Sequence, residues 1–209
     1  MTTHLYAFGS ICRGEAGPGS DIDLLACIST PKPDLDPKKF SIYTYERIRQ
    51  LWREGNPFAW HLHLESRLIF SSDGSDFLAS LGAPSRYTRI SEDCMKFHKL
   101  FSESYDSLLR SSNSMVFHLS CLFLATRNFA TCYSFGTGRP IFSRKSPLLI
   151  DRKLPISDEA FDVFVRARIL STRGYGPSIS EREGDTAKAS SPLILDWMQH
   201  LCPLETQYE

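Results

Sequence analysis

The sequence predicts an α+β protein, in which a small mixed-sheet domain is followed by an α-helical bundle. Short apolar runs separated by turns rich in glycine and proline dominate the first part of the chain, and such runs are typical of strands and short helices. Further along, apolar residues recur at helical spacing over two long segments, 91–110 and 113–135. This change of pattern places a boundary at residues 83–90, and we set the domains at 1–86 and 87–209.

Composition and charge exclude several classes of protein. The chain has 209 residues, of which 42% are hydrophobic, and this is enough to build a core. Its 24 basic residues balance 24 acidic ones, so the net charge indicates neither a nucleic-acid nor a membrane partner. The apolar stretches are too short to span a bilayer, and the N-terminus lacks the pattern of a signal peptide. Because the cysteines form no C-x-x-C pair, we expect reduced thiols in a cytoplasmic protein.

Two strands are predicted near the N-terminus, over residues 4–8 and 21–28. In the second strand, apolar residues alternate with Asp21 and Asp23, so the two carboxylates would point the same way, about 7 Å apart. Carboxylates at this spacing repel each other and resist desolvation. We therefore expect a divalent cation with oxygen ligands to offset their charge.

The turn before these carboxylates has the features of a phosphate-binding site. Gly9 permits a tight turn and a close backbone approach, and Ser10 offers a hydroxyl and a backbone N–H to a phosphate. A helix that begins at Ser10 would add the positive field of its N-terminus. The segment thus predicts a phosphate cradle beside a metal site, and such sites serve phosphoryl transfer.

The run FGSICRGEAGPGSDIDLL, residues 8–25, resembles the signature of the DNA polymerase β-like nucleotidyltransferase superfamily, and its minimal nucleotidyltransferases in particular. In that superfamily the serine of the Gly-Ser turn contacts nucleotide phosphates, two acidic residues bind magnesium, and a third carboxylate lies on a later strand. We take Glu65 as that third carboxylate. The resemblance assigns nucleotide binding to Gly9, Ser10, Arg13 and Ser20. It assigns catalysis and metal binding to Asp21, Asp23 and Glu65.

The resemblance implies a nucleotidyltransferase reaction. An acceptor hydroxyl would attack the α-phosphate of a nucleoside triphosphate, which we expect to be ATP, so that AMP is transferred and pyrophosphate leaves. Mg²⁺ or Mn²⁺ is the implied cofactor. The acceptor stays open between a small molecule, a tRNA end and a protein hydroxyl, and a homodimer is one open assembly. The alternative is a regulatory module of toxin–antitoxin type, in which binding of a nucleotide or a partner dominates over catalysis.

Two further elements are predicted before the domain boundary. An Asp-Pro pair at residues 36–37 is typical of a helix start, and apolar residues at helical spacing follow it until the Gly-Asn-Pro sequence at 55–57. Residues 58–70 are predicted to form a strand whose period of two places three polar residues on one face. These residues are His61, His63 and Glu65. The two histidines are either ligands or bases, or ordinary surface or core residues.

The C-terminal part is similar to the helical domains that accompany such transferases, including the HEPN (higher eukaryotes and prokaryotes nucleotide-binding) group. Helices are also predicted at 157–171 and 192–202, with a mobile loop at 174–190 between them. HEPN ribonucleases carry an arginine and then a histidine, whereas here Arg127 is followed by Cys132. A thiol is a poor general base near neutral pH, and this argues against ribonuclease activity. A HEPN-type ribonuclease that the transferase half regulates is the third and least favoured alternative. Arg127 either contacts a phosphate or is a buried structural arginine.

Overall fold

The structure is a computed structural model that describes residues 2–15, 22–30, 35–110 and 114–202. It divides into two compact units, Met1–Thr88 and Arg89–Glu209. The first unit contains a sheet and short helices, the second consists of helices, and each has its own hydrophobic core. The predicted α+β class, with a mixed sheet followed by helices, is therefore confirmed.

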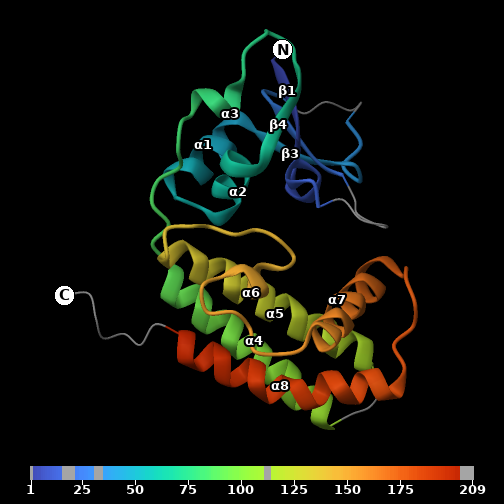
Figure 1. Ribbon diagram of the computed structural model, residues 1–209. Helices are drawn as coiled ribbons and strands as arrows, with labels where there is room; N and C mark the ends of the chain where they lie inside the picture. Colours follow the sequence, from blue (N-terminus) through green and yellow to red (C-terminus); the bar gives the residue numbers. More distant parts are fainter. Residues whose placement is uncertain (1, 16–21, 31–34, 111–113, 203–209) are drawn as a thin grey trace, which may run out of the picture. The chain divides into compact units, whose positions relative to one another are not determined.

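The first unit is built on a four-stranded mixed sheet (Figure 1). Its strands are β1 (Thr3–Phe8), β2 (Asp23–Ile28), β3 (Phe40–Thr44) and β4 (Ser66–Ser71). They lie in the order β3-β2-β1-β4, in which β1 is antiparallel to both of its neighbours and β2 is parallel to β3. Because of this pairing, the C-terminal end of β1 lies between the first residues of β2 and β4.

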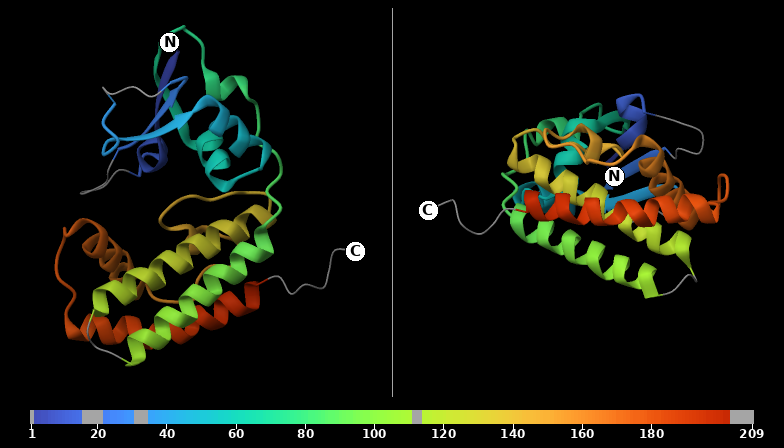
Figure 2. Two further views of the ribbon diagram at one scale, coloured as in Figure 1. Left: turned by 180° about the vertical axis from the view of Figure 1, so that it is seen from behind. Right: turned by 60° about the horizontal axis from the view of Figure 1, so that its bottom comes forward.

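Three short helices cover one face of this sheet (Figure 2). They are α1 (Tyr45–Arg53), α2 (Pro57–Glu65) and α3 (Phe77–Ser80). The core between the helices and the sheet contains Tyr6, Phe8, Leu25, Ile48, Leu51 and Leu62. Alternate residues of β1 (Tyr6 and Phe8) and of β2 (Leu25 and Cys27) thus point into one core, as the period of two of a strand requires.

The helix predicted to start at residues 36–37 is wrong in its first part. Residues 40–44 form β3 beside β2, and α1 begins only at Tyr45. The side chain of Thr44 caps α1, because its Oγ1 accepts a hydrogen bond from the N–H of Arg47 at 3.2 Å. The apolar residues of this short segment fit both the period of a strand and that of a helix. They form a strand because the segment pairs with β2.

The strand predicted at 58–70 is wrong in its first half, because α2 occupies those residues and only β4 is a strand. Asn56 caps α2 by accepting a hydrogen bond from the N–H of Phe58 at 2.9 Å, and Pro57 is in the first turn. A capping residue followed by proline is the signal that we assigned to residues 36–37, and it starts a helix here instead.

This correction changes which side chains lie together on α2. In a helix, residues four apart share a side, whereas residues two apart do not. His61 and Glu65 are therefore neighbours, and His63 points elsewhere. The predicted grouping of all three residues on one face is wrong.

The second unit is a helical bundle around α5 (Met115–Gly136), which contacts each of the other helices of the unit. These are α4 (Ile90–Arg110), α6 (Ser146–Leu149), α7 (Asp158–Arg173) and α8 (Glu181–Leu201). The largest fully buried side chains of its core include Phe101, Phe129, Phe164 and Met198. Over the described residues, no helix is both long enough and apolar enough to cross a membrane.

The loop predicted at 174–190 is wrong from residue 181 onward, because α8 starts there and also contains the predicted short helix. A capping box of Ser180 and Glu183 fixes this start. Inside α8, Gly184 packs so closely against Met115 that a Cβ would lie 2.3 Å from its Sδ. The glycine that favoured a loop in the sequence is therefore a packing residue within a helix.

The capping box predicts an acid-sensitive start of α8. Hydrogen bonds from the backbone and then the hydroxyl of Ser180, followed by the Arg166 ion pair, lower the pKa of Glu183 from 4.5 to about 2. Because the folded-state pKa is the lower one, this stabilisation is complete above pH 4.5 and is lost as the pH falls towards about 2. We expect the urea midpoint, followed by circular dichroism, to fall over this range.

The matched variant for this experiment is Glu183→Gln, which keeps an acceptor oxygen but cannot titrate. Its midpoint should fall less steeply with pH than that of the wild type. Asp73, whose pKa is lowered to about 2 chiefly by the backbone N–H of Ser75, titrates over the same range in both proteins. Equal slopes for the two proteins would show that Glu183 does not contribute.

Candidate active site

Three segments meet at the end of the sheet where β1 finishes. Phe8, the last residue of β1, pairs with Asp23 on one side and with Ser66 on the other. Gly9 directly follows Phe8, and Glu65 directly precedes Ser66. The pairing therefore brings the Gly-Ser turn and two acidic residues, far apart in the sequence, to one end of the sheet.

Gly9 lies against the carboxylate of Asp23. Its φ is +79°, in the left-handed region, and a Cβ at this position would lie 2.7 Å from Oδ2 of Asp23. Glycine satisfies both requirements, because it adopts this conformation readily and has no Cβ to collide with the carboxylate. Asp23 itself is an exposed residue. The turn and the first acidic residue of β2 thus form one local structure.

The residues after Gly9 form a short 3-10 helix, η1 (Gly9–Arg13), which ends at Gly14 in the left-handed conformation. The carbonyl of Ser10 accepts a hydrogen bond from the N–H of Glu15 at 2.9 Å. Because a 3-10 helix has three residues per turn, Ser10 and Arg13 lie on the same side of η1. Two of the predicted nucleotide-binding residues therefore share one side of this turn.

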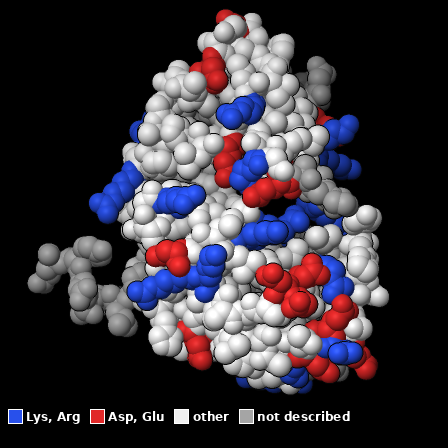
Figure 3. All heavy atoms as spheres, viewed as in Figure 1, with Lys and Arg blue, Asp and Glu red and all other residues white. Residues whose placement is uncertain are grey.

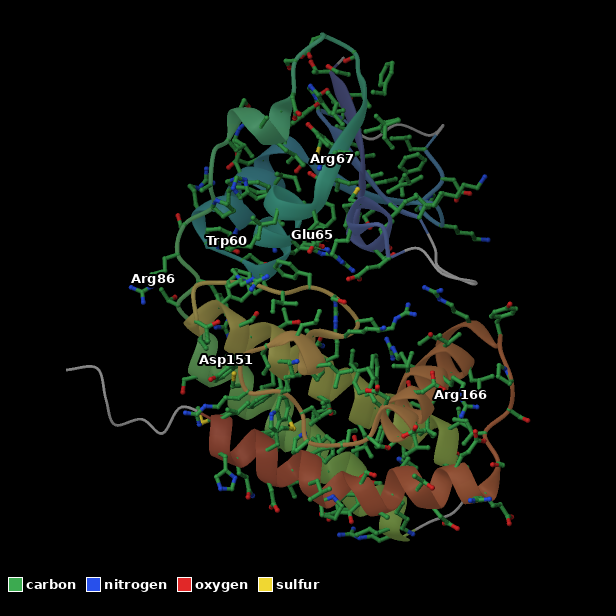
Figure 4. All side chains as sticks on the ribbon, viewed as in Figure 1. Trp60, Glu65, Arg67, Arg86, Asp151 and Arg166 are labelled. Atoms are coloured by element: carbon green, nitrogen blue, oxygen red, sulfur yellow. The ribbon has the colours of Figure 1, made fainter. Side chains whose placement is uncertain are left out.

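Glu65 is the centre of a charged cluster at the junction of α2 and β4 (Figure 4). Its Oε2 accepts a hydrogen bond from Nη1 of Arg13 and lies 2.9 Å from Nε2 of His61. The side chains of Glu65, Arg13 and His61 are only 13%, 18% and 17% exposed. Glu65 is therefore a largely buried carboxylate with two basic partners, and it lies at the end of a helix.

Two other residues, Cys12 and Arg67, lie close enough to this cluster to interact with it electrostatically. The Sγ of Cys12 donates to the carbonyl of Ala7 at 3.4 Å, and burial raises the pKa of its thiol. Cys12 is thus a packing residue and a poor nucleophile at neutral pH. Arg67, on β4, is exposed and close enough to lower that pKa in part. Sequence reasoning missed this positive charge, although its position two residues after Glu65 was a signal.

Two predicted site residues, Ser20 and Asp21, lie outside the described residues. Within the described part of the chain, no three His, Cys, Asp or Glu side chains are grouped to hold a metal ion. The donor chemistry at the end of the sheet nevertheless suits a hard cation, because carboxylate oxygens are the ligands that Mg²⁺ prefers. Asp23 fits this role as an exposed carboxylate, whereas Glu65 fits it only if it exchanges a basic partner for the cation.

In the second unit, Arg127 joins α5 to the segment that follows it. Its Nη2 donates to the carbonyl of Phe142 at 2.7 Å, and its own carbonyl accepts from the hydroxyl of Ser146 at 3.1 Å. Cys132 is buried in the core of the bundle. These contacts favour the structural alternative for Arg127.

Residues 2–93 match the family model described as the nucleotidyltransferase domain. The matched range contains the whole sheet, α1 to α3 and the first residues of α4, and it includes the Gly-Ser turn, Asp23 and Glu65. No curated protein matches the chain. The match supports nucleotidyl transfer as the general activity of the first unit.

Proposed function

We propose that this chain uses its nucleotidyltransferase domain to transfer AMP from ATP to a hydroxyl acceptor, with release of pyrophosphate. The observation that carries this proposal is the convergence of the Gly9–Ser10 turn, Asp23 and Glu65 at one end of the sheet. This is the arrangement that phosphoryl transfer needs, with groups for the phosphates next to carboxylates that can hold a cation.

The residues of η1 would bind the triphosphate. Ser10 offers its hydroxyl and its backbone N–H, and Arg13 offers a guanidinium on the same side of the turn. An arginine suits this role because its planar donors match phosphate oxygens in pairs. Binding here would hold the α-phosphate in a fixed place beside Asp23, and such positioning supplies a large part of the rate enhancement.

Asp21, Asp23 and Glu65 are the residues that would hold Mg²⁺ or Mn²⁺. The chemistry that such a cation supplies when bound is neutralisation of the charge that develops on the transferred phosphoryl group. The protein contributes exposed carboxylate oxygens at Asp23 and, through Gly9, a turn that reaches within contact distance of them. Glu65 is the third ligand or the base that accepts the proton of the acceptor hydroxyl.

The charge distribution favours a small acceptor over a long nucleic acid. Binding of a long nucleic acid usually needs a surface with clustered positive charge. The chain carries equal numbers of basic and acidic residues, and on the face drawn in Figure 3 both signs are interspersed. We therefore rank a hydroxyl on a small molecule or on a protein first, and the end of a tRNA stays the third candidate acceptor.

Isothermal titration with each of the four nucleoside triphosphates and Mg²⁺ tests the proposal. We expect ATP to bind the wild type and to bind Asp21→Asn/Asp23→Asn at least about tenfold more weakly, because the variant loses both charges that hold the cation. If the folded wild type binds none of the four, the transferase proposal fails. The toxin–antitoxin-type regulatory role would then be the better explanation, and a binding partner should be sought.

A further inference from the structure

The two basic partners of Glu65 are held in different ways. His61 is on the same helix, one turn earlier, and its ring packs edge-on against the buried ring of Phe8 with centroids 5.6 Å apart. Arg13 instead comes from the last residue of the five-residue η1. His61 is therefore fixed to the core beside Glu65, whereas Arg13 reaches Glu65 from a separate short turn.

Arg13 is also divided between two carboxylates. Its Nη1 donates to Glu65, and its Nε donates to Oε2 of Glu15 at 2.9 Å. The side chain of Glu15 is 40% exposed, compared with 13% for Glu65, so solvent screens the Glu15 contact more strongly. In this state the guanidinium that shares a side with Ser10 is occupied by protein carboxylates.

We propose that Arg13 is an exchangeable partner of Glu65 and that His61 is the positioning residue that holds Glu65 when Arg13 leaves. This inference rests on the proposed function, because the group that draws Arg13 away is a nucleoside triphosphate bound at the Gly9–Ser10 turn. Arg13 then pairs with phosphate oxygens, and the Glu65 carboxylate loses its guanidinium partner while Nε2 of His61 stays 2.9 Å away. That carboxylate becomes available to a cation only when a triphosphate is present.

If Arg13 exchanges between Glu65 and a triphosphate, the effect of Glu65 on ATP affinity should depend on whether a divalent cation is present. Without a divalent cation, a triphosphate must break the Arg13–Glu65 pair and leave Glu65 with a single basic partner beside a polyanion. Glu65 should therefore oppose ATP binding when no cation is present. With a cation, the same carboxylate should favour binding, because it gains a new positive partner.

ATP titration in EDTA buffer, followed by calorimetry, tests this with the full chain. We expect Glu65→Gln to bind ATP about tenfold more tightly than the wild type, because Arg13 is no longer occupied. This gain should disappear in Arg13→Gln/Glu65→Gln, whose affinity should match that of Arg13→Gln. In Mg²⁺ the sign should reverse, so that Glu65→Gln binds ATP more weakly than the wild type.

Two further variants serve as controls. Glu15→Gln removes the other carboxylate charge that pairs with the Arg13 guanidinium, at the more exposed of the two contacts. Its gain in ATP affinity in EDTA should therefore be smaller than that of Glu65→Gln. His61→Leu leaves the Arg13–Glu65 pair in place, so it should show no gain in EDTA and should lose affinity in Mg²⁺. Thermal melts of all variants establish that each is folded at the temperature of the titration.

The outcomes separate this inference from the proposed function. If Glu65→Gln gains no affinity in EDTA, the exchange is wrong. If the gain persists without Arg13, the exchange is also wrong, and removal of the carboxylate charge beside the triphosphate explains the gain. The transferase site would still stand, provided that the wild type binds ATP in Mg²⁺. If neither the wild type nor any variant binds ATP with or without Mg²⁺, both proposals fail together.

Discussion

Asp23→Asn is expected to lower turnover by about a thousandfold or more while leaving the fold intact, because it removes the charge proposed to hold the cation but preserves the shape of the side chain. Asparagine has the size of aspartate, so it fits the space beside Gly9 that the carboxylate now occupies. The measurement is pyrophosphate release from ATP and Mg²⁺ with a panel of hydroxyl acceptors. A variant that is both folded and fully active would rule out Asp23 as a metal ligand.

The matched control is the same substitution at Asp36, another exposed aspartate of the first unit. Its Oδ1 accepts a hydrogen bond from the N–H of Lys38 at 2.9 Å, in the turn before β3. An amide oxygen can accept the same bond. Asp36→Asn should therefore retain turnover within about twofold, since surface substitutions rarely have large effects, and a loss at both positions would indicate a general response to charge.

The sequence predicted the first two strands of the first unit better than the segments that follow them. The Gly-Ser turn and the first two strands were recognisable because a glycine, a serine and closely spaced aspartates follow one another within residues 9–23. Between them and the helical unit, the same capping signal was assigned to residues 36–37, whereas it operates at 56–57. Local signals could not decide between these positions, because the pairing of β3 with β2 and of β4 with β1 joins residues far apart in the chain.

The same limit applies to the candidate site. Glu65 was selected for its chemistry, and the structure places it at the sheet end where Gly9 and Asp23 also lie, although on a helix. Its contacts with Arg13 and His61 depend on the pairing of β4 and on the helical turn of α2, and neither was predicted. Whether Glu65 binds a cation stays a prediction, and the titrations with and without Mg²⁺ decide it.

Gly9→Ala is expected to lower both stability and ATP binding, because the turn has no room for a side chain. Any non-glycine residue at φ +79° costs about 1–2 kcal/mol in backbone strain. The new Cβ would also lie 2.7 Å from Oδ2 of Asp23, so the carboxylate or the turn must move. We expect a total loss of about 2–4 kcal/mol in urea unfolding, together with at least about tenfold weaker binding of ATP in Mg²⁺.

Gly14→Ala separates the two causes, because Gly14 has nearly the same φ of +72° and a Cβ there meets nothing within 4 Å. This variant should lose only the backbone part, about 1–2 kcal/mol, and should keep most of its affinity for ATP. A second test combines Gly9→Ala with Asp23→Ala, which removes the carboxylate that the new Cβ would meet. If the clash is the cause, Gly9→Ala should cost no more in the Asp23→Ala background than Gly14→Ala costs in the wild type. An undiminished cost in that background would mean that the strain of the turn itself, and not its approach to Asp23, requires glycine at this position.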